Sequence, residues 1–442
     1  MIDVIPTGLE ALTIYAPTRF LDIRDFAAAR RVDEEKYTVG LGLKRMAVPA
    51  PHEDTVTMAV TAATRMLFNY QIDPASIGML IVASESPVDF AKSTAAYVHG
   101  FLGLPSRCRI FDVKQACYGG TAALKIASDW CAVPAGSPKK ALVIATDIAR
   151  YDIDSPGEAT QGAGAVAMLV SENPRILTFA PFEEAVFAED TMDFWRPAYR
   201  NEAVVNGRLS IKTYLKALEH TYAVHKAATR LTAKDFDALL FHSPFPKMAE
   251  KAHAKLHLID DGESSSASLT EAFEHQTAPG ITANKAVGNI YTGALYLSLA
   301  SLLEHPDLVP KKRIGLFSYG SGASAEFFSG RLGTDPTAWR SKTGIASLRS
   351  RERISFEAYR HLRALQESLS RNDSFDGAAH ESIDAACTLA FMGIKDHRRV
   401  YERRSARLNP EAYSTDDMPP HSQGSPPFPE IKDSKPPLSC RY

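Results

Sequence analysis

Cys117 has the surroundings of a reactive thiol. It stands between an expected strand, RIFDV, and an expected helix that begins with Tyr-Gly-Gly-Thr. A thiol at a helix N-terminus meets free N–H groups and the positive end of the helix dipole, which lower its pKa. Gly119 and Gly120 would let a substrate approach the sulfur closely. A lone cysteine is more often a buried structural residue, so both interpretations stay open for Cys117. Cys108 and Cys131 lack this context and are expected to be structural.

Two titratable side chains follow apolar stretches where strands should end. Glu85 comes after IGMLIVAS, where partial desolvation would raise its pKa toward that of a useful general base. His242 follows FDALLF and precedes Ser-Pro-Phe-Pro, and a histidine at the carboxyl end of a strand points into the usual crevice of α/β proteins. Each also has an ordinary interpretation, a solvated acid for Glu85 and a loop hydrogen bond for His242.

Other features have weaker chemical meaning. GSGAS after RIGLFSY offers backbone N–H groups for an oxyanion hole, but neither it nor GAGAV has a Walker or Rossmann spacing. Lys247 and Lys251 lie four apart on one helix face, which suits an anionic ligand or simply solvent. His253 and His257 lack a third ligand nearby, so we expect them on a helix surface rather than at a metal.

The elements around these residues alternate between strand and helix. Apolar spacing predicts a helix over 56–69, and the nearly continuous apolar run 77–83 predicts a strand buried on both faces. A short strand at 109–113, a helix from 119 to about 132 and a strand at 141–146 follow. This order is typical of α/β layers around a buried sheet.

The same order then recurs. FDALLF resembles IGMLIVA, VGNIYTGALYLSLASLLE resembles QACYGGTAALKIASDW, and RIGLF resembles ALVIAT. The separation of Cys117 from Thr146 equals that of Asn289 from Ser318. We therefore expect a duplicated α/β unit, whose catalytic groups would face one another from paired strand ends.

Composition limits the classes of protein to consider. The 442 residues include 50 Lys plus Arg and 52 Asp plus Glu, and the formal charge of -2 argues against nucleic-acid binding. No apolar stretch is long enough to span a membrane, and the N-terminus lacks the features of a signal peptide. Five cysteines without CxxC spacing fit a reducing compartment. We expect a soluble, cytoplasmic enzyme.

The chain divides into four expected parts. Residues 1–170 form a first half with Glu85 and Cys117, and residues 171–333 form a second half with His242, Asn289 and the Gly-rich loop. An Arg-rich, helical extension is expected over 334–410. The Pro-rich tail 411–442 has little that could form a core and is predicted to be disordered.

Taken together, these segments resemble a 3-hydroxy-3-methylglutaryl-CoA synthase of the thiolase superfamily, in its short bacterial form. The resemblance covers about residues 1–330 and reappears near DHRRVY, and it is carried by ASES, KQACYGGT, FHSPFPKMAEKAH, GNIYTGALYLSL and LFSYGSG. It implies a thiolase-like α/β fold, duplicated and arranged in five αβαβα layers. It also implies the catalytic residues Glu85, Cys117 and His242 and the substrate-binding residues Asp33, Thr160, Ser210, Lys247, Lys251, Asn289 and Ser321.

The resemblance further implies a reaction. Cys117 would accept acetyl from acetyl-CoA, Glu85 would remove a methyl proton, and the carbanion would attack acetoacetyl-CoA, held by His242 and Asn289. Water would then release 3-hydroxy-3-methylglutaryl-CoA, a precursor in the mevalonate pathway to isoprenoids. No metal or organic cofactor is implied, no nucleic-acid or membrane partner is expected, and family members are homodimers.

Three alternatives remain open. A ketoacyl synthase III-like enzyme also uses Cys, His and Asn, but needs no carboxylate base, so Glu85 speaks against it. A polyketide-cassette synthase would act on acyl-carrier-protein thioesters. KQACYGGT looks like that branch, whereas Lys247, Lys251 and the lack of a long insertion between Asp147 and Gly164 favour CoA. A non-catalytic thiolase-like binding protein would not need Cys117, Glu85 and His242 together.

Overall fold

The computed structural model describes residues 5–134, 139–262, 265–369, 375–376 and 387–404. All of these fall within one unit of the chain, residues 1–408. The predicted tail 411–442 lies outside the described residues. None of the helices in the described part of the chain combines the length and apolar character that crossing a bilayer requires.

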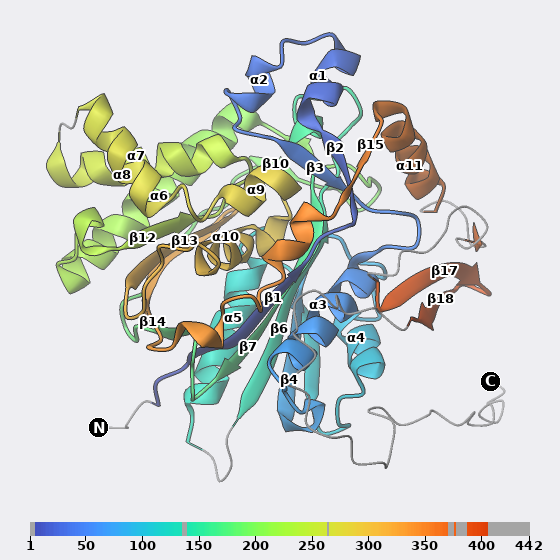
Figure 1. Ribbon diagram of the computed structural model, residues 1–442, viewed down its shortest axis with the longest axis horizontal. Coiled ribbons are helices and arrows are strands. Elements are labelled where there is room, and N and C mark those ends of the chain that lie inside the picture. The colour runs from blue at the N-terminus through green and yellow to red at the C-terminus, as the bar shows by residue number, and fades with distance from the viewer. Residues whose placement is uncertain (1–4, 135–138, 263–264, 370–374, 377–386, 405–442) are drawn as a thin grey trace. The chain divides into compact units, whose positions relative to one another are not determined.

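The first half of the chain builds a five-stranded half-sheet in the order β1-β7-β6-β4-β5 (Figure 1). Its strands are β1 (Gly8–Tyr15), β4 (Ile77–Ala83), β5 (Arg109–Val113), β6 (Lys140–Ile148) and β7 (Ala163–Ser171). β4 is parallel to β5 and β6, while β7 is antiparallel to both β6 and β1. Figure 1 shows α3 (Thr55–Asn69) and α4 (Thr94–Leu102) beside one face and α5 (Gly119–Ala132) beside the other.

The second half repeats this succession of strands. The order β12-β13-β14-β8 has one parallel pair followed by two antiparallel pairs, as β4-β6-β7-β1 has. The strands are β8 (Leu177–Phe179), β12 (Ala238–Phe241), β13 (Arg313–Gly320) and β14 (Ser324–Leu332). α6 (Gly207–Thr229) packs on β13 and β14, and α10 (Ala294–Leu303) packs on β12 and β13. The two halves thus have the arrangement expected of a duplicated unit.

The half-sheets join where β8 pairs with β1, and β9 (Ala185–Ala188) adds to β14. The layers are α3 with α4, the first half-sheet, α5 with α10, the second half-sheet, and α6. This confirms the predicted five-layer αβαβα, thiolase-like fold. The remaining elements are α1 (Ile23–Arg30), α2 (Glu35–Thr38), α7 (Pro246–Asp261), α8 (Ser266–Gln276), α9 (Thr282–Val287), β2 (Arg19–Asp22), β3 (Arg45–Val48), β10 (Phe194–Trp195) and β11 (Val204–Val205).

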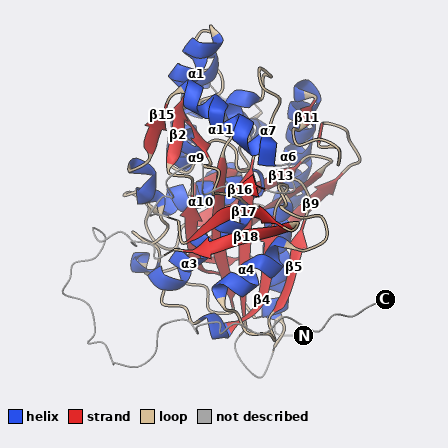
Figure 2. Cartoon of the chain, turned by 90° about the vertical axis from the view of Figure 1, so that its right-hand side faces the viewer, coloured by secondary structure: helices blue, strands red, loops and turns tan. Residues whose placement is uncertain are grey.

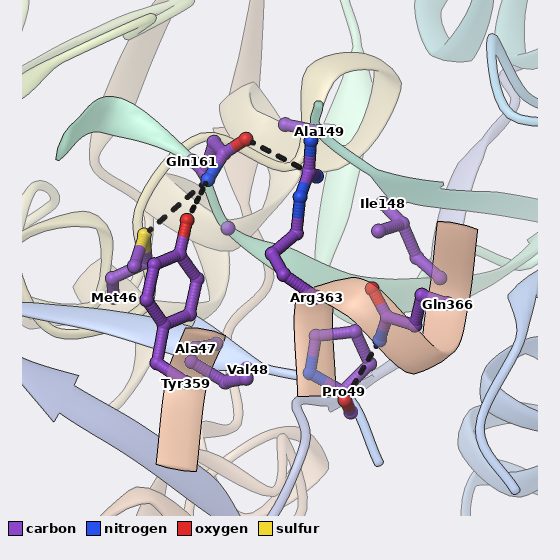
Figure 3. A pocket seen from close by; sticks show the side chains of 11 residues that line it. Met46, Ala47, Val48, Pro49, Ile148, Ala149, Gln161, Tyr359, Arg363 and Gln366 are labelled. Atoms are coloured by element: carbon purple, nitrogen blue, oxygen red, sulfur yellow. Dashed lines mark hydrogen bonds between the residues drawn. The ribbon is translucent and has the colours of Figure 1, made fainter. Parts of the chain in front are cut away.

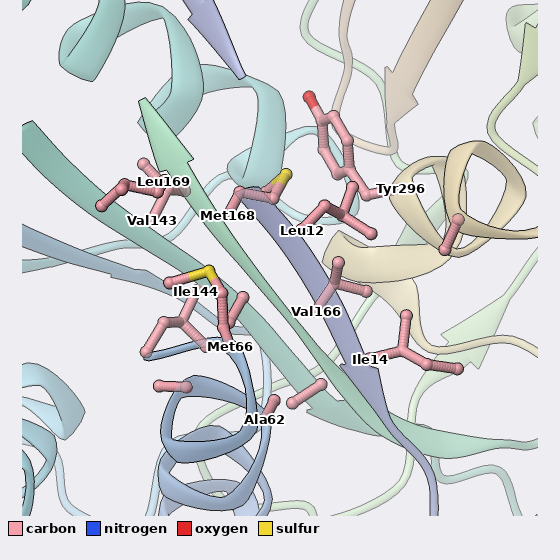
Figure 4. Packing of buried hydrophobic residues seen from close by; sticks show 14 of the residues in the cluster. Leu12, Ile14, Ala62, Met66, Val143, Ile144, Val166, Met168, Leu169 and Tyr296 are labelled. Atoms are coloured by element: carbon pink, nitrogen blue, oxygen red, sulfur yellow. The ribbon is translucent and has the colours of Figure 1, made fainter. Parts of the chain in front are cut away.

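The core explains why these stretches are so apolar. Asp54 begins α3 with a capping box, in which its carboxylate accepts from the Thr57 N–H at 2.8 Å. α3 then buries Ala62 and Met66 between β1, β6 and β7, as Figure 4 shows. On the other face, Tyr296 of α10 belongs to the same apolar cluster. Because both faces are covered, the strands carry continuous rather than alternating apolar runs.

The extension beyond residue 333 is not the helical segment that we predicted. It contains α11 (Phe356–Leu369), but also β15 (Glu352–Ile354), β16 (Phe375–Asp376) and the hairpin β17 (Leu389–Lys395) with β18 (Arg398–Arg403), seen face on in Figure 2. The hairpin turns through Asp396 and His397, both with positive φ, 50° and 61°. Two consecutive residues with positive φ suit the turn of a tight hairpin. We predicted a helix here because the segment is rich in arginine.

Candidate active site

Glu85 and Cys117 meet at the carboxyl ends of neighbouring strands. β4 and β5 run parallel, so the residues that follow them emerge at the same edge of the sheet. The Cys117 thiol donates to Glu85 Oε1 at 3.1 Å. Of the four cysteines among the described residues, Cys117 alone is not buried, and Cys108 and Cys131 lie in the core as expected. The Cys117 residue is therefore only partly buried, and its thiol is paired with the Glu85 carboxyl group.

A strained turn presents Cys117. Ala116 has a φ of +44°, a conformation that L residues other than glycine rarely adopt. A Cβ on Gly120 would lie 2.4 Å from the Thr292 carbonyl oxygen, and one on Gly119 would lie 3.3 Å from the Thr292 methyl. The two glycines therefore make room for a turn of the second half, where we had expected them to make room for substrate.

Asp147 supports this edge from inside the sheet, and sequence reasoning gave it no role. It is fully buried near the end of β6. Its Oδ1 accepts from the Glu85 N–H at 2.7 Å and from the Ser84 and Ser86 hydroxyls at 3.1 and 3.0 Å. Its Oδ2 accepts from the Thr292 N–H at 3.1 Å. The polar Asp in the apolar run ALVIATDI was the signal that could have found it.

Burial shifts the ionisation of these groups toward their neutral forms. Burial, then the Asp147 carboxylate, raises the pKa of Glu85 to about 8, and burial raises the pKa of Asp147 to about 6. Burial and the Glu85 carboxylate also raise the pKa of the Cys117 thiol well above its ordinary value. This corrects our expectation of a lowered pKa, because desolvation of the thiolate outweighs the helix N-terminus at this site.

His242 comes from the second half. It follows β12 and is buried, its N–H donates to the Phe317 carbonyl of β13 at 2.8 Å, and its own carbonyl accepts from the Tyr214 hydroxyl at 2.8 Å. Burial lowers the pKa of its imidazole to about 3. β13 ends at Gly320, where a Cβ would lie only 2.5 Å from the Tyr118 nitrogen. The strand next to His242, β13, therefore ends in close contact with the turn that contains Cys117.

Asn289 and Thr160 lie side by side, both buried. The Asn289 N–H donates to the Thr160 carbonyl at 2.9 Å, and the Asn289 side-chain oxygen accepts from the Tyr291 N–H at 2.9 Å. Tyr291 and Tyr151, which sequence reasoning missed, interact electrostatically with Glu85 and Cys117. Asn289 and Thr160 are therefore held close to a pair of hydrogen-bonded tyrosines that interact electrostatically with Glu85 and Cys117.

The other predicted binding residues lie in four places. Ser321 is half-buried in the turn after β13 and is hydrogen-bonded to Tyr319. Ser210 is half-buried in the first turn of α6, and exposed Asp33 accepts from the Glu35 N–H that begins α2. The remaining two are the α7 lysines.

Lys247 and Lys251 lie in the first turns of α7. The Lys247 N–H donates to the Leu41 carbonyl at 3.0 Å, so the segment after α2 abuts the start of this helix. Its ammonium pairs with Glu250 at 2.7 Å, whereas Lys251 is exposed. The structure thus joins Lys247 to the segment that contains Asp33, and it does not bring the two lysines together with the Cys117–Glu85 pair.

His253 and His257 are buried, which corrects our expectation of a helix surface. Their Nε2 atoms lie 2.9 and 3.0 Å from the same oxygen of Gln276, whose amide nitrogen donates to two backbone carbonyls. Both rings are thus donors in the core. In the described ranges, no three His, Cys, Asp or Glu side chains gather as metal ligands would.

Comparison with known families agrees with this architecture. The family model for the hydroxymethylglutaryl-coenzyme A synthase N terminal matches residues 5–174, and the model for the C terminal of the same synthase matches residues 178–272 and 263–404. A hydroxymethylglutaryl-CoA synthase of Enterococcus faecalis is 40% identical over 80% of this chain and 90% of its own length. The polyketide 3-hydroxy-3-methylglutaryl-ACP synthase PksG of Bacillus subtilis is 36% identical over 80% and 87%.

Solved structures place the chain in the same group. The structure described as MvaS in complex with 3-hydroxy-3-methylglutaryl coenzyme A matches with a TM-score of 0.83 and 40% identity, over 90% of this chain and 99% of that one. The fold and the site define an acyl-CoA condensing enzyme with a thiolase-like fold. Within that class, the chain belongs to the hydroxymethylglutaryl-CoA synthase family.

Proposed function

We propose that this enzyme condenses acetyl-CoA with acetoacetyl-CoA and water to form 3-hydroxy-3-methylglutaryl-CoA through an acetyl-Cys117 intermediate, as a step of the mevalonate pathway. The observation that carries the proposal is the 3.1 Å hydrogen bond between the Cys117 thiol and Glu85. An acetyl group on the sulfur would therefore lie beside a carboxyl base whose pKa is raised to about 8.

In the first step, the Cys117 sulfur attacks the acetyl carbonyl carbon and the CoA sulfur leaves. The thiol proton moves to the departing CoA sulfur, and Glu85 lies where it can hold that proton in between. Backbone N–H groups at the start of α5 and near Ser321 would stabilise the negative oxygen.

In the second step, Glu85 removes a proton from the acetyl methyl group and the resulting carbanion attacks the ketone of acetoacetyl-CoA. His242, which its lowered pKa keeps neutral, donates an N–H hydrogen bond to the developing alkoxide. The alkoxide then takes up a proton and Glu85 gives up the one that it removed, so the net movement is one proton from carbon to oxygen. Water then cleaves the thioester: its oxygen joins the acyl carbon, one proton goes to the Cys117 sulfur, and the other is released to solvent as the product ionises to the carboxylate. Asn289, which is held beside Thr160, would position the second substrate.

The preference for CoA is supported by positive charge at the start of α7. The Lys44 N–H donates to the Lys285 carbonyl at 2.9 Å, and burial and then nearby Lys44 lower the pKa of the Lys285 ammonium, although the Glu274 and Glu250 carboxylates oppose this shift. Lys44, Lys247 and Lys285 therefore lie near one another, and such a group of cations would suit a phosphate ligand once it displaces Glu250 from Lys247. The alternative is a carrier-protein thioester, because the polyketide relative PksG is also similar.

An assay with matched substrates decides between the carriers. Acetyl and acetoacetyl thioesters of CoA and of an acyl carrier protein are compared at equal concentrations, with release of free thiol as the signal. We expect kcat/KM to be at least about tenfold higher for CoA, which is about 1.4 kcal/mol. A preference for the carrier protein would assign the enzyme to polyketide synthesis instead.

We also propose that the enzyme is a cytoplasmic homodimer. β5 is the outer strand of its half-sheet, and Phe90, beyond β4, is 92% exposed; an outer strand of this kind can pair with a second copy. The four cysteines in the described ranges are free thiols, which suits a reducing compartment. Light scattering should give twice the chain mass for the wild type, and Ile110→Lys in β5 should give a monomer. A wild-type monomer would reject the dimer, and cell fractionation tests the compartment.

A further inference from the structure

We propose that α11 of the C-terminal extension positions the active site, with Arg363 as its main positioning residue: the Arg363 guanidinium fixes the Tyr151 peptide and thereby the Tyr151 ring beside Cys117 and Glu85. The proposal rests on the proposed function and adds to it a role for a segment that lies outside the duplicated halves.

Arg363 reaches the segment that follows β6. It is only 5% exposed, and its Nη2 donates to the Tyr151 carbonyl at 3.0 Å. Its Nη1 lies 3.5 Å from Gln161 Oε1, and the same oxygen accepts from the Tyr151 N–H at 2.8 Å. Both polar groups of the Tyr151 backbone are therefore held, one by α11 directly and the other by Gln161. Figure 3 shows Arg363 beside Gln161.

Gln161 is the centre of this network. Its amide nitrogen donates to the Tyr359 hydroxyl of α11 at 3.0 Å (Figure 3), and that hydroxyl donates to Glu158 at 2.8 Å. Gln161 also forms an isolated bridge with Asn289. Gln161, Tyr359 and Glu158 are all buried. Because a buried polar group that loses its partner suffers the full cost of its desolvation, such a network fixes a single arrangement.

The Tyr151 side chain connects this network to the chemistry. Its hydroxyl is hydrogen-bonded to Thr160 and Tyr291, and after burial itself, the neighbouring Cys117 and Glu85 raise its pKa most. Tyr151 is 7% exposed and so helps to exclude water from the thiol and the carboxyl group. A displaced Tyr151 would admit water and reduce the desolvation that sets the pKa of both groups.

The acceptors around Arg363 determine which substitutions can test its role. Its guanidinium also lies 3.7 Å from Glu202 and 3.9 Å from Glu367. Arg363→Met keeps most of the length of the side chain but leaves the Tyr151 carbonyl without this donor. Arg363→Lys keeps a cation that can still reach the carbonyl, though not both acceptors together. Arg360, exposed on the same helix, supplies the matched control Arg360→Met.

The experiment uses the full chain and measures four quantities for the wild type and each variant: kcat, KM, Tm, and the pH midpoint for alkylation of Cys117 by iodoacetamide, followed by mass spectrometry. For Arg363→Met we expect kcat to fall at least about tenfold with KM for acetyl-CoA within about twofold, and the alkylation midpoint to move to lower pH. Arg363→Lys should recover part of kcat, and Arg360→Met should match the wild type.

A wholly structural role predicts a different result. Arg363→Met would then lower Tm while leaving kcat and the alkylation midpoint unchanged below the unfolding temperature, and this outcome would overturn the proposal. If Arg363→Met does not fold, Arg363→Lys and Tyr359→Phe decide by the same measurements. Alkylation needs no substrate, so it tests the positioning role independently of condensation. If the wild type failed to condense acetyl-CoA, that result would reject the proposed function but not the positioning role.

Discussion

The two halves of the molecule share one succession of strands, yet burial acts on their chemical groups in opposite directions. In the first half, burial raises the pKa of Glu85 to about 8 and raises that of Cys117 as well. In the second half, burial lowers the pKa of His242 to about 3. Desolvation disfavours the charged form in every case, so it raises the pKa of acids and lowers that of a base.

The two halves use the same succession of strands to support two different chemical roles. A carboxyl group, a thiol and an imidazole follow the carboxyl ends of strands, and burial favours the neutral form of each, while a pKa of about 8 still leaves part of Glu85 ionised near neutral pH to act as a base. In the first half the groups are linked by hydrogen bonds: the Asp147 carboxylate accepts from the Glu85 N–H, and the Glu85 carboxyl group accepts from the Cys117 thiol. The second half holds His242 by its backbone. We therefore expect proton transfer in the first half and hydrogen-bond donation in the second.

The largest effect should come from removing the nucleophile. Cys117→Ala leaves no sulfur to accept acetyl, so covalent labelling by radioactive acetyl-CoA should be abolished. Cys131→Ala is the matched control, because Cys131 is a buried thiol of the helix that follows Cys117. Label that survives on the Cys117→Ala protein would show that the acyl carrier lies elsewhere.

The next largest effect should separate Glu85 from His242. Glu85→Ala should still become acetylated, because it also removes the carboxylate that raises the pKa of Cys117. It should lose condensation by roughly 10²–10⁴-fold, the usual worth of a general base. His242→Ala should acetylate too, but bind acetoacetyl-CoA poorly.

Hydrogen exchange distinguishes these two variants. With the acetyl-enzyme in deuterated water, His242→Ala should exchange the methyl hydrogens and Glu85→Ala should not. Exchange at the wild-type rate in Glu85→Ala would mean that another group removes the proton, and the contrast between the halves would lose its chemical basis.

The contributions of Glu85 and His242 to folding stability should change with pH in opposite directions. Between its ordinary 4.5 and the folded value of about 8, Glu85 is ionised in the unfolded chain and protonated in the folded one, so its contribution to stability falls as pH rises. His242 costs stability as pH falls from 6.5 toward about 3.

Urea unfolding at about pH 5 and about pH 8 measures this contrast. Relative to the wild type, Glu85→Gln should gain on the order of 2 kcal/mol more at the higher pH, and His242→Gln a similar amount at the lower pH. Equal gains at both pH values would show that burial does not govern these groups.

Much of this arrangement could be predicted from sequence because it is encoded locally. The run IGMLIVA has the pattern of a strand covered on both faces, and β4 spans those residues, Ile77–Ala83. The helix expected from residue 119 to about 132 is α5, Gly119–Ala132. The sequence also predicted that catalytic groups would follow strand ends, and Glu85 and Cys117 lie beyond the carboxyl ends of β4 and β5, which are parallel.

What could not be predicted depends on contacts between distant residues. The raised pKa of Cys117 comes from burial and from Glu85, neither of which the helix N-terminus reveals. Gln276 makes His253 and His257 core residues from another helix. Arg363 looked like one of many arginines in the extension, and only the fold shows it bonded to Tyr151.

The smallest expected effect concerns the start of α7, which belongs to the second half but lies outside the contrast of neutral groups, because its lysines act through charge. Lys247→Ala with Lys251→Ala should raise KM for acetyl-CoA by about tenfold and leave kcat nearly unchanged, because phosphate contacts are made equally in substrate and transition state. Lys255→Ala is the matched control on the same helix, since Lys255 pairs with Glu219 at 2.9 Å. The effect should shrink at high salt, as expected for exposed charges. An unchanged KM in the double variant would mean that this helix face is merely solvated, and that Lys44 and Lys285 or an acyl carrier must account for substrate binding.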